Sequence, residues 1–390
     1  MKQLTIILII FIAAISTKAE IDFDIKGYVY NMLTYMNLSK SQQQDYGLNT
    51  GHLATNITRL RLMPNLNIGD NSRITMHYEI DGLFSKVNLP FFSSPGITNR
   101  QAVKLNWDIT KTDSTSDVSF ITNHYIDMLY FKQFFDWGEF VFGRQVVTWG
   151  VGRIWQPTDL FNPINPANFA KIERDGSDAL SGKIYLGDFT DMEFVVNFRE
   201  MIRDYNYGTR FRSNYEGYDL TAVMGYFDQR AVVGGDFAGN LFDAGVRGEA
   251  IYSFKRNDSM DAYIRFILGA DYQITGDLYA LIEYQYNGEG TNNKDEYMAY
   301  FGRLMKGEIQ NMGQNYLALM SSYQIHPLVG SSLTNITNLG DGSGMLGVTG
   351  TYNMYQDFNI GLGTMFFYGA DGGEYSFYPT ALYLTVEYFF

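Results

Sequence analysis

The feature that most constrains this chain is a regular alternation of apolar and polar residues, sustained in several segments for about ten residues. Between 72 and 81 the two alternating sets are Ile74, Met76, Tyr78 and Ile80 on one side and Arg73, Thr75, His77, Glu79 and Asp81 on the other. Similar segments occur at 261–271, 278–287 and 382–390. Because successive side chains of a β-strand point to opposite faces, this pattern predicts strands with one apolar and one polar face.

The length of these segments separates two all-β architectures. Strands of a β-sandwich usually have about 5–6 residues, whereas a tilted strand that crosses a bilayer needs about 9–11. Aromatic residues also lie near segment ends, as at Tyr284 and Tyr286 or at 366–368, where the aromatic girdles of a membrane barrel belong. We therefore expect an all-β fold consisting of a single transmembrane antiparallel β-barrel.

The N-terminus has the composition of an export signal. Lys2 is followed by an almost wholly apolar run from Leu4 to Ile15, and Thr17-Lys18-Ala19 supplies small residues before a cut. This order predicts a signal peptide at 1–19, too short to span a membrane, with the barrel at 20–390. A single N-terminal membrane anchor is the alternative interpretation.

Composition excludes several other classes of protein. An aromatic content of 16% argues against disorder, and the lack of repeated apolar runs of roughly 20 residues argues against a helical membrane protein. A net charge of −13 gives no basic patch for nucleic acid. The chain has no Cys, and its histidines at 52, 77, 124 and 326 show no metal-ligand spacing, so we expect no metal, no cofactor and no enzyme site.

Turn chemistry and parity together predict about 18 strands, with 16 or 20 as alternatives. Short turns rich in Gly, Asn and Asp should alternate with long outer loops at 38–53, 85–118, 150–177 and 288–313, which places both termini at the periplasmic end. Residues 102–109 are assigned to the second loop, because a further wall strand would break the parity. The predicted strands are 22–37, 54–68, 72–84, 119–134, 139–149, 178–187, 190–202, 205–214, 217–228, 231–238, 242–254, 261–273, 277–287, 314–324, 328–338, 344–355, 358–368 and 378–390.

The last strand carries a second indication. Leu384, Val386, Tyr388 and the terminal Phe390 alternate and end on an aromatic residue. This ending is similar to the signal read by the machinery that inserts bacterial outer-membrane barrels, with Tyr388 and Phe390 as its principal residues. The alternative is an ordinary final strand that ends in Phe.

Charged residues on the polar sides of the strands are expected to line a water-filled lumen. An Arg on the lipid face would cost ~2–4 kcal/mol at the midplane, and a barrel of this size is too wide for wall side chains to fill. The predicted lumen-lining or selectivity residues are Arg59, Arg61, Arg73, His77, Glu79, Asp81, Arg199, Arg247, Glu249, Arg265 and Glu283, with Arg210 and Arg212 in similar positions. The alternative for each is a charge pair that only braces the inner wall.

The loop at 150–177 is predicted to fold into the barrel as a constriction. Pro157, Pro163 and Pro166 cannot continue a strand ladder and stiffen the segment. Trp155 and Phe161 need apolar surroundings, which a loop waving in water would not supply.

The start of this loop also resembles a known group of proteins. The run Gly143-Arg144-Gln145, followed by Trp149-Gly150 and then by Asn162-Pro163, is similar to the G-R-Q-x-x-x-W-G and N-P signature of a family of bacterial outer-membrane barrels, many of them uncharacterised, near the alginate-export-like and porin-like proteins. The resemblance covers about 120–290, including 230–239 and the Arg247 segment, and it implies a transport barrel without fixing a substrate. By this resemblance the signature residues are Arg144, Gln145, Trp149, Asn162 and Pro163, with loop docking and substrate contact both open as their role.

The expected function is that of a porin-like outer-membrane channel, in which small polar or charged solutes pass by diffusion or facilitated transport through a charge-lined lumen. The alternative is a structural or surface barrel, a partner sheath or an adhesin, without transport of its own. Expected partners are outer-membrane lipid, the insertion machinery and a small solute, but no nucleic acid. Formation of a homo-oligomer, charge selectivity and the direction of transport stay open.

Overall fold

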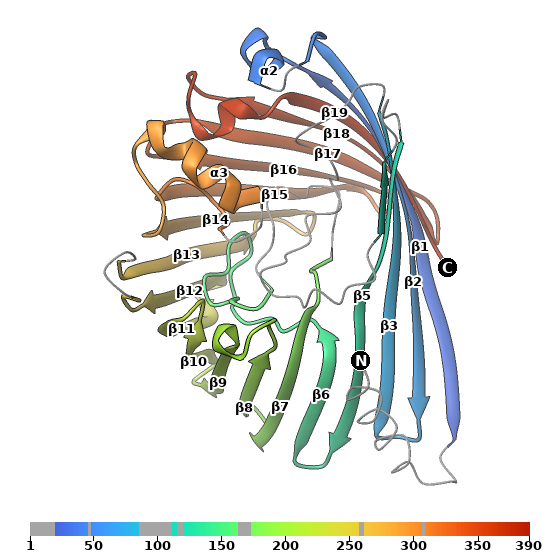
Figure 1. Ribbon diagram of the computed structural model, residues 1–390, viewed down its shortest axis with the longest axis vertical. Helices are drawn as coiled ribbons and strands as arrows, with labels where there is room; N and C mark the ends of the chain where they lie inside the picture. Colours follow the sequence, from blue (N-terminus) through green and yellow to red (C-terminus); the bar gives the residue numbers. More distant parts are fainter. Residues whose placement is uncertain are drawn as a thin grey trace.

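The computed structural model describes residues 20–45, 48–85, 111–114, 120–162, 173–256, 261–305 and 309–390. Within them, eighteen antiparallel strands form one closed barrel, in which each strand pairs with its neighbour along the chain (Figure 1). These strands are β1 (Ile21–Asn37), β2 (His52–Ile68), β3 (Ser72–Ser85), β5 (Phe120–Phe135), β6 (Gly138–Gln145), β7 (Ser177–Gly187), β8 (Thr190–Asn197), β9 (Asn206–Tyr215), β10 (Tyr218–Phe227), β11 (Arg230–Leu241), β12 (Ala244–Ser253), β13 (Tyr263–Gln273), β14 (Leu278–Asn287), β15 (Asn315–His326), β16 (Val329–Asn338), β17 (Gly344–Tyr355), β18 (Phe358–Tyr368) and β19 (Thr380–Phe389).

The remaining elements are short and lie in the connections. The strand β4 (Lys111–Ser114) pairs with β5, while β3 pairs with β5 directly. The helices are α2 (Lys40–Asp45), α3 (Tyr297–Met305) and three single 3-10 turns at Ile202–Asp204, Lys294–Glu296 and Glu374–Phe377. Across the described ranges, none of the helices has both the length and the apolar character required to traverse a membrane.

The predicted barrel of 18 strands is confirmed. At one end, which we call the short-turn end, every connection has two to four residues, and β1 begins and β19 finishes there. At the other end the connection between β10 and β11 is also a two-residue turn. Two predicted strands are too long: the one at 139–149 ends at Gln145, and the one at 190–202 ends at Asn197. In the first, the Val147 amide donates to the Asn162 side chain instead of a ladder. In the second, the Asn197–Asn206 pair closes the ladder and a 3-10 turn follows. The segment 102–109 lies outside the described residues.

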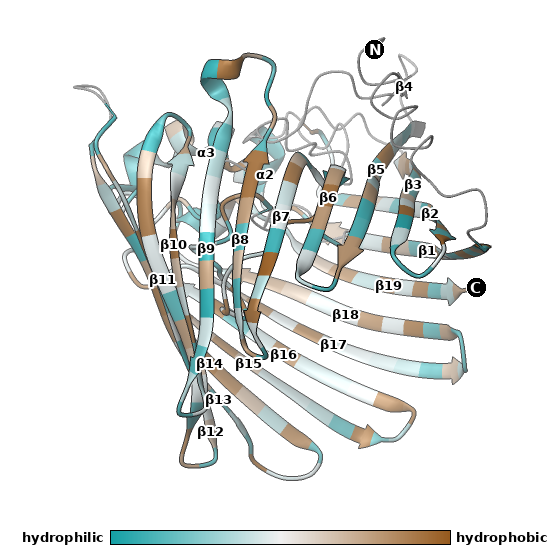
Figure 2. Ribbon diagram, turned by 90° about the horizontal axis from the view of Figure 1, so that it is seen from below, coloured by the Kyte–Doolittle hydropathy of each residue, from teal (hydrophilic) through white to brown (hydrophobic). Residues whose placement is uncertain are grey.

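Burial follows the alternation in the sequence, and Figure 2 shows apolar and polar bands succeeding each other along the strands. Leu268 and Ile282 face outwards and are 55% and 47% exposed, whereas Glu283, the next residue on β14, is 0% exposed. Large exposed apolar side chains occur on strands all around the wall, among them Leu33, Phe84, Phe194, Leu220, Leu319 and Leu362. The predicted arrangement of an apolar outer face and a polar inner face is confirmed.

The barrel closes where β1 meets β19. Ten residues of each strand pair, from Tyr28 with Phe389 to Asn37 with Thr380. The terminal Phe390 continues the ladder, because its amide donates to the Gly27 carbonyl at 3.0 Å and its carbonyl accepts from the Gly27 amide at 2.8 Å. A Cβ at position 27 would lie 2.5 Å from the Phe390 ring and 2.6 Å from the Arg61 carbonyl oxygen. Glycine is therefore required at the closing seam.

We predict that Gly27→Ala weakens the closure of the barrel by about 1–3 kcal/mol, because the added methyl group overpacks the seam against backbone as well as a ring. The measurement is the temperature at which the folded band disappears from an SDS gel of the purified protein. Gly182→Ala in β7 is the matched control, since a Cβ there meets nothing within 4 Å. Equal melting of the two variants would contradict the prediction.

Candidate functional site

The segment 146–162, which follows β6, lies inside the barrel against the inner wall (Figure 1). Its Trp149 and Phe161 rings are fully buried and contact each other edge to face at 5.0 Å. Phe161 also packs on Phe227 of β10 at 4.7 Å, and the Trp149 indole donates to Glu193 of β8 at 3.0 Å. The apolar side chains of the segment thus cover the inside of β7, β8 and β10 to β12.

Two wall carboxylates hold the next stretch of the segment by its backbone. Glu249 of β12 accepts from the amides of Val151 at 2.9 Å, Gly152 at 3.2 Å and Thr158 at 2.5 Å, and from the Thr158 hydroxyl at 2.7 Å. Glu283 of β14 accepts from the three consecutive amides of 153–155 at 2.9, 3.1 and 2.8 Å. We call 150–158 the anchored loop. Seven hydrogen bonds hold this loop against β12 and β14, although the segment begins at the end of β6.

Glycines allow the backbone to come this close to the carboxylates. Gly150 has φ +98°, a conformation that side chains disfavour, and a Cβ there would lie 2.6 Å from a Glu249 oxygen. A Cβ on Gly152 would lie 1.8 Å from the Trp155 carbonyl oxygen. The shape of the anchored loop therefore depends on both glycines.

This arrangement changes the interpretation of Glu249 and Glu283. Both were predicted to line the lumen, and both face inwards. Their oxygens are occupied by loop amides, however, and the two residues are 3% and 0% exposed. They hold the loop and are not open to a passing solute.

The two ends of the in-folded segment are tied to each other. The Asn162 side chain accepts from the Val147 amide at 2.7 Å and donates to the Asp175 carbonyl. Arg174 forms an ion pair with Asp159 and donates to the Asn162 carbonyl at 3.2 Å. Pro163 lies outside the described residues. The polar signature residue Asn162 thus closes the base of the segment.

Arg144 and Gln145 act at the same base. The Arg144 guanidinium forms two parallel hydrogen bonds of 3.0 Å with Asp178, its direct neighbour on β7, and a third of 3.0 Å with the Ile126 carbonyl. Gln145 donates to the Val141 and Ala179 carbonyls at 3.2 and 3.0 Å. Both side chains are buried. These two signature residues therefore join β5, β6 and β7 at the point where the segment leaves β6.

A buried network of charges connects β2, β3 and β5. Arg61 contacts Glu79 at 2.5 Å and Asp127 at 2.6 Å, and Arg59 contacts Asp81 at 2.8 Å and Glu79 at 3.2 Å. All five side chains are at most 6% exposed. Charges buried together in this way stabilise each other only because their donors and acceptors meet closely. The network braces the wall, which is the alternative left open for Arg59, Arg61, Glu79 and Asp81.

Asp127 was not predicted as part of this network. The register of β3 against β5 shifts between His77 and Tyr78, which pair with Met128 and Ile126, so Asp127 is the extra residue of a bulge. A bulge can direct an additional side chain to one face of a strand. His77 itself lies beside Arg61, with 3.1 Å between Nδ1 and the guanidinium.

The other predicted lumen residues are spread over the barrel. Arg73 is exposed near the short-turn end and donates to Asn67 at 2.7 Å, while Arg247 pairs with Asp271. Arg199 lies in the connection beyond the end of β8, not on a wall strand. Arg265 packs over the Tyr263 ring at 5.1 Å. The structure therefore does not bring the predicted charges together in one ring.

Within the described residues, no three His, Asp or Glu side chains form a group that could hold a metal ion. Residues that the sequence did not single out also shape the site: Glu193 holds Trp149, and Thr158 caps Glu249. The sequence around Glu193 and Thr158 contains no local pattern that would predict these contacts.

Comparison with known proteins identifies the fold. No model of a known protein family matches the sequence, and no curated protein matches it. Among solved structures, Acinetobacter baumannii OccAB4 is similar with a TM-score of 0.57 at 9% identity, over 96% of this chain and 99% of that chain. Pseudomonas aeruginosa OccD3 (OpdP) and A. baumannii OccAB3 each have a TM-score of 0.55, at 8% and 10% identity, over 94% and 95% of this chain and 91% and 99% of theirs. The chain has a porin-like barrel fold, as the resemblance implied. Its placement in the family with the G-R-Q-x-x-x-W-G signature stays a prediction.

We predict that Glu249→Gln releases the anchored loop, because the new amide group turns a donor towards loop amides that need an acceptor. A buried amide without a partner costs about 1–3 kcal/mol, so hydrogen exchange at Val151, Gly152 and Thr158 should quicken by roughly 10- to 100-fold. Mass spectrometry of the purified barrel measures this exchange. Glu387→Gln in β19 is the control and should leave it unchanged; unchanged exchange in Glu249→Gln as well would show that the loop does not depend on the carboxylate.

We predict that Arg61→Met lowers the free energy of unfolding by about 3–5 kcal/mol, because it removes the Arg61 cation from two buried carboxylates, Asp127 and Glu79, of which Glu79 keeps its ion pair with Arg59. Urea unfolding of the purified barrel in detergent measures the loss. Arg73→Met, which removes an exposed Arg, should cost less than about 1 kcal/mol. A similar loss in both variants would refute a bracing role for the buried network.

Proposed function

We propose that this protein is a porin-like channel of the bacterial outer membrane, through which small polar or charged solutes diffuse passively. The observation that carries the proposal is a loop fastened inside a wide closed barrel by Glu249 and Glu283. An 18-stranded barrel leaves a lumen that its wall side chains cannot fill. A loop anchored across part of that lumen narrows the passage.

The apolar outer face supports the location in a membrane. Exposed Leu, Ile, Phe and Tyr side chains cover the outside of the wall, and a protein surface of this kind is stable against lipid and unstable in water. Removal of residues 1–19 as a signal peptide, and recognition of Tyr388 and Phe390 by the insertion machinery, belong to the same proposal. Tyr388 and Phe390 both project outwards from the wall and are each 49% exposed, so an external factor can reach them.

Solute contact is assigned to charges that the structure leaves accessible. Arg153 is exposed at the tip of the anchored loop while its backbone is held by Glu283. Arg73, Arg199 and Arg265 are exposed or half-buried on the barrel wall or at its rim. We infer that these residues contact solutes and that Arg59, Arg61, Glu79 and Asp81 stabilise the wall.

The signature residues are proposed to mark barrels that share this loop. Arg144, Gln145 and Asn162 fix the base of the in-folded segment, and Trp149 fixes its path along the wall. Membership of the resembling family belongs to the same proposal, with a loop docked in this way expected in its other members. Association into a homo-oligomer would be compatible with the apolar outer face.

We predict that the purified chain forms steady ion-conducting pores in planar lipid bilayers, and that Glu249→Ala combined with Glu283→Ala gives larger and noisier single-pore currents. The double variant removes the acceptors of seven hydrogen bonds, so the loop no longer narrows the passage at a fixed position. Glu387→Ala is the control and should conduct like the parent. Absence of any current from folded parent protein would refute the channel and favour a structural barrel.

A further inference from the structure

The barrel wall is divided into a charged part and an uncharged part. The five consecutive strands β15 to β19 contain a single Asp, Glu, Lys or Arg among them, Glu387. Their inward positions carry hydroxyl and amide groups, including Ser332, Thr334, Thr349, Thr351, Asn353, Tyr383 and Thr385. A solute that follows this side of the lumen meets neutral donors and acceptors.

An apolar row interrupts this neutral surface. Ile336 pairs with Met345, and Met345 pairs with Phe367, so the three side chains lie side by side on β16, β17 and β18. They face inwards, because Leu333, Val348 and Phe366 on the alternate positions are exposed on the outside. Apolar side chains at inward positions need a partner, since a polar lumen gives them nothing to pack against.

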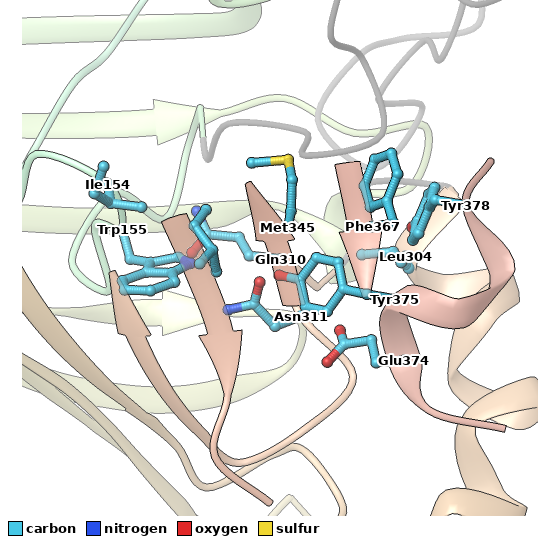
Figure 3. Close-up of a pocket in the computed structure, with 11 residues that line it drawn as sticks. Ile154, Trp155, Leu304, Gln310, Asn311, Met345, Phe367, Glu374, Tyr375 and Tyr378 are labelled. Carbon is cyan, nitrogen blue, oxygen red and sulfur yellow. The ribbon is translucent and has the colours of Figure 1, made fainter. Parts of the chain in front are cut away.

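The row forms one side of a pocket that other segments complete (Figure 3). Ile154 and Trp155 come from the anchored loop, Gln310 and Asn311 from the connection after α3, and Glu374, Tyr375 and Tyr378 from the connection between β18 and β19. The pocket has a volume of about 120 Å³, whereas one water needs roughly 10–15 Å³. It therefore has room for a ring-sized group.

Aromatic rings give the pocket flat apolar faces. Phe367 lies nearly parallel to Tyr378, at 26° and 5.3 Å between ring centroids, and to Tyr375, at 18° and 6.5 Å. In Figure 3, Trp155 lies across the pocket from these three rings, and Gln310 and Asn311 lie between the two sides. Such a site can pack against both faces of a flat group and contact its polar edge.

The polar groups of the pocket favour an uncharged occupant. Glu374 is the one acidic residue among the described residues that line the pocket, and its oxygens accept from the Met312 amide and the Asn338 side chain at 2.8 Å each and from the Tyr316 hydroxyl. Burial raises the pKa of Glu374. The part of the chain that the structure describes contributes no Lys or Arg to the lining. The half-buried amide of Gln310 makes no hydrogen bond with the described residues, so it is available to a ligand.

We propose that this pocket binds one ring of an uncharged, hydroxyl-rich solute, that is, of a sugar. The proposal rests on the channel function and names the substrate class. A sugar ring has apolar C–H faces, which pack on aromatic rings, and a hydroxyl edge, which pairs with amides. A purely aromatic solute would leave Gln310 unpaired, and an anion would find no cation, so both fit the pocket less well.

The test measures ion current through single reconstituted pores in the presence of maltose. We expect maltose to interrupt the current, gluconate to interrupt it far less, and Tyr378→Ala and Gln310→Ala each to raise the half-blocking maltose concentration by roughly 3- to 10-fold. Gln273→Ala, at the exposed last residue of β13 at the short-turn end, is the matched control, and maltose should block it as it blocks the parent. All variants are first checked for the folded band on an SDS gel.

The outcomes separate this inference from the channel function. Conducting pores that maltose does not block, or that maltose blocks equally in parent, Tyr378→Ala and Gln310→Ala, overturn the sugar pocket and leave the channel standing. Absence of current overturns the channel; the pocket is then tested in detergent through the fluorescence of Trp155, with Trp155→Phe as the reference. A maltose-dependent change that Gln310→Ala removes supports the pocket, and no change in the parent overturns it.

Discussion

Closure of the strand ladder is the constraint on which the rest of this structure depends. A sheet with an apolar outer face cannot leave a row of amides and carbonyls unpaired in lipid, so the first and last strands must meet. They meet through ten paired positions and through the two hydrogen bonds between Gly27 and Phe390. An antiparallel barrel that closes in this way needs an even number of wall strands and brings both termini to the same end. The strand parity and the end at which each connection lies follow from this requirement.

A second constraint acts on the inside of the wall, where charge must be compensated. Arg59 and Arg61 meet carboxylates on β3 and β5, and Glu249 and Glu283 meet the amides of a loop. In both cases the protein uses inward-facing charge to hold itself together, because a buried charge without partners would cost more than any single contact in the wall. The inward-facing charged residues alone therefore do not indicate which solutes the lumen selects.

The sequence predicts the barrel well because a period of two is a local signal that each strand repeats. It predicts strand ends less well: β6 ends at Gln145 because Asn162 takes the next free amide, and that contact depends on a residue 15 positions away from Val147. The roles of Glu249 and Glu283 were missed for the same reason, since alternation shows that they face inwards but not which backbone reaches them. The inward position of Asp127 was not predicted, because the bulge in β5 shifts the strand register and no local sequence pattern indicates a bulge there. Arg199 was placed on a strand that the Asn197–Asn206 pair ends earlier.

The anchored loop and the aromatic pocket are connected through Trp155, which belongs to both. The backbone amide of Trp155 donates a hydrogen bond to Glu283, and the Trp155 ring lines the pocket. The same ring packs on Tyr316 with 6.0 Å between ring centroids. The hydrogen bonds that hold the anchored loop therefore also hold the Trp155 ring at the pocket. A loop held only at its ends would leave the indole free to move away from the wall. Because Glu283 of β14 accepts from three consecutive amides, one carboxylate fixes both the path of the anchored loop and the position of the Trp155 ring.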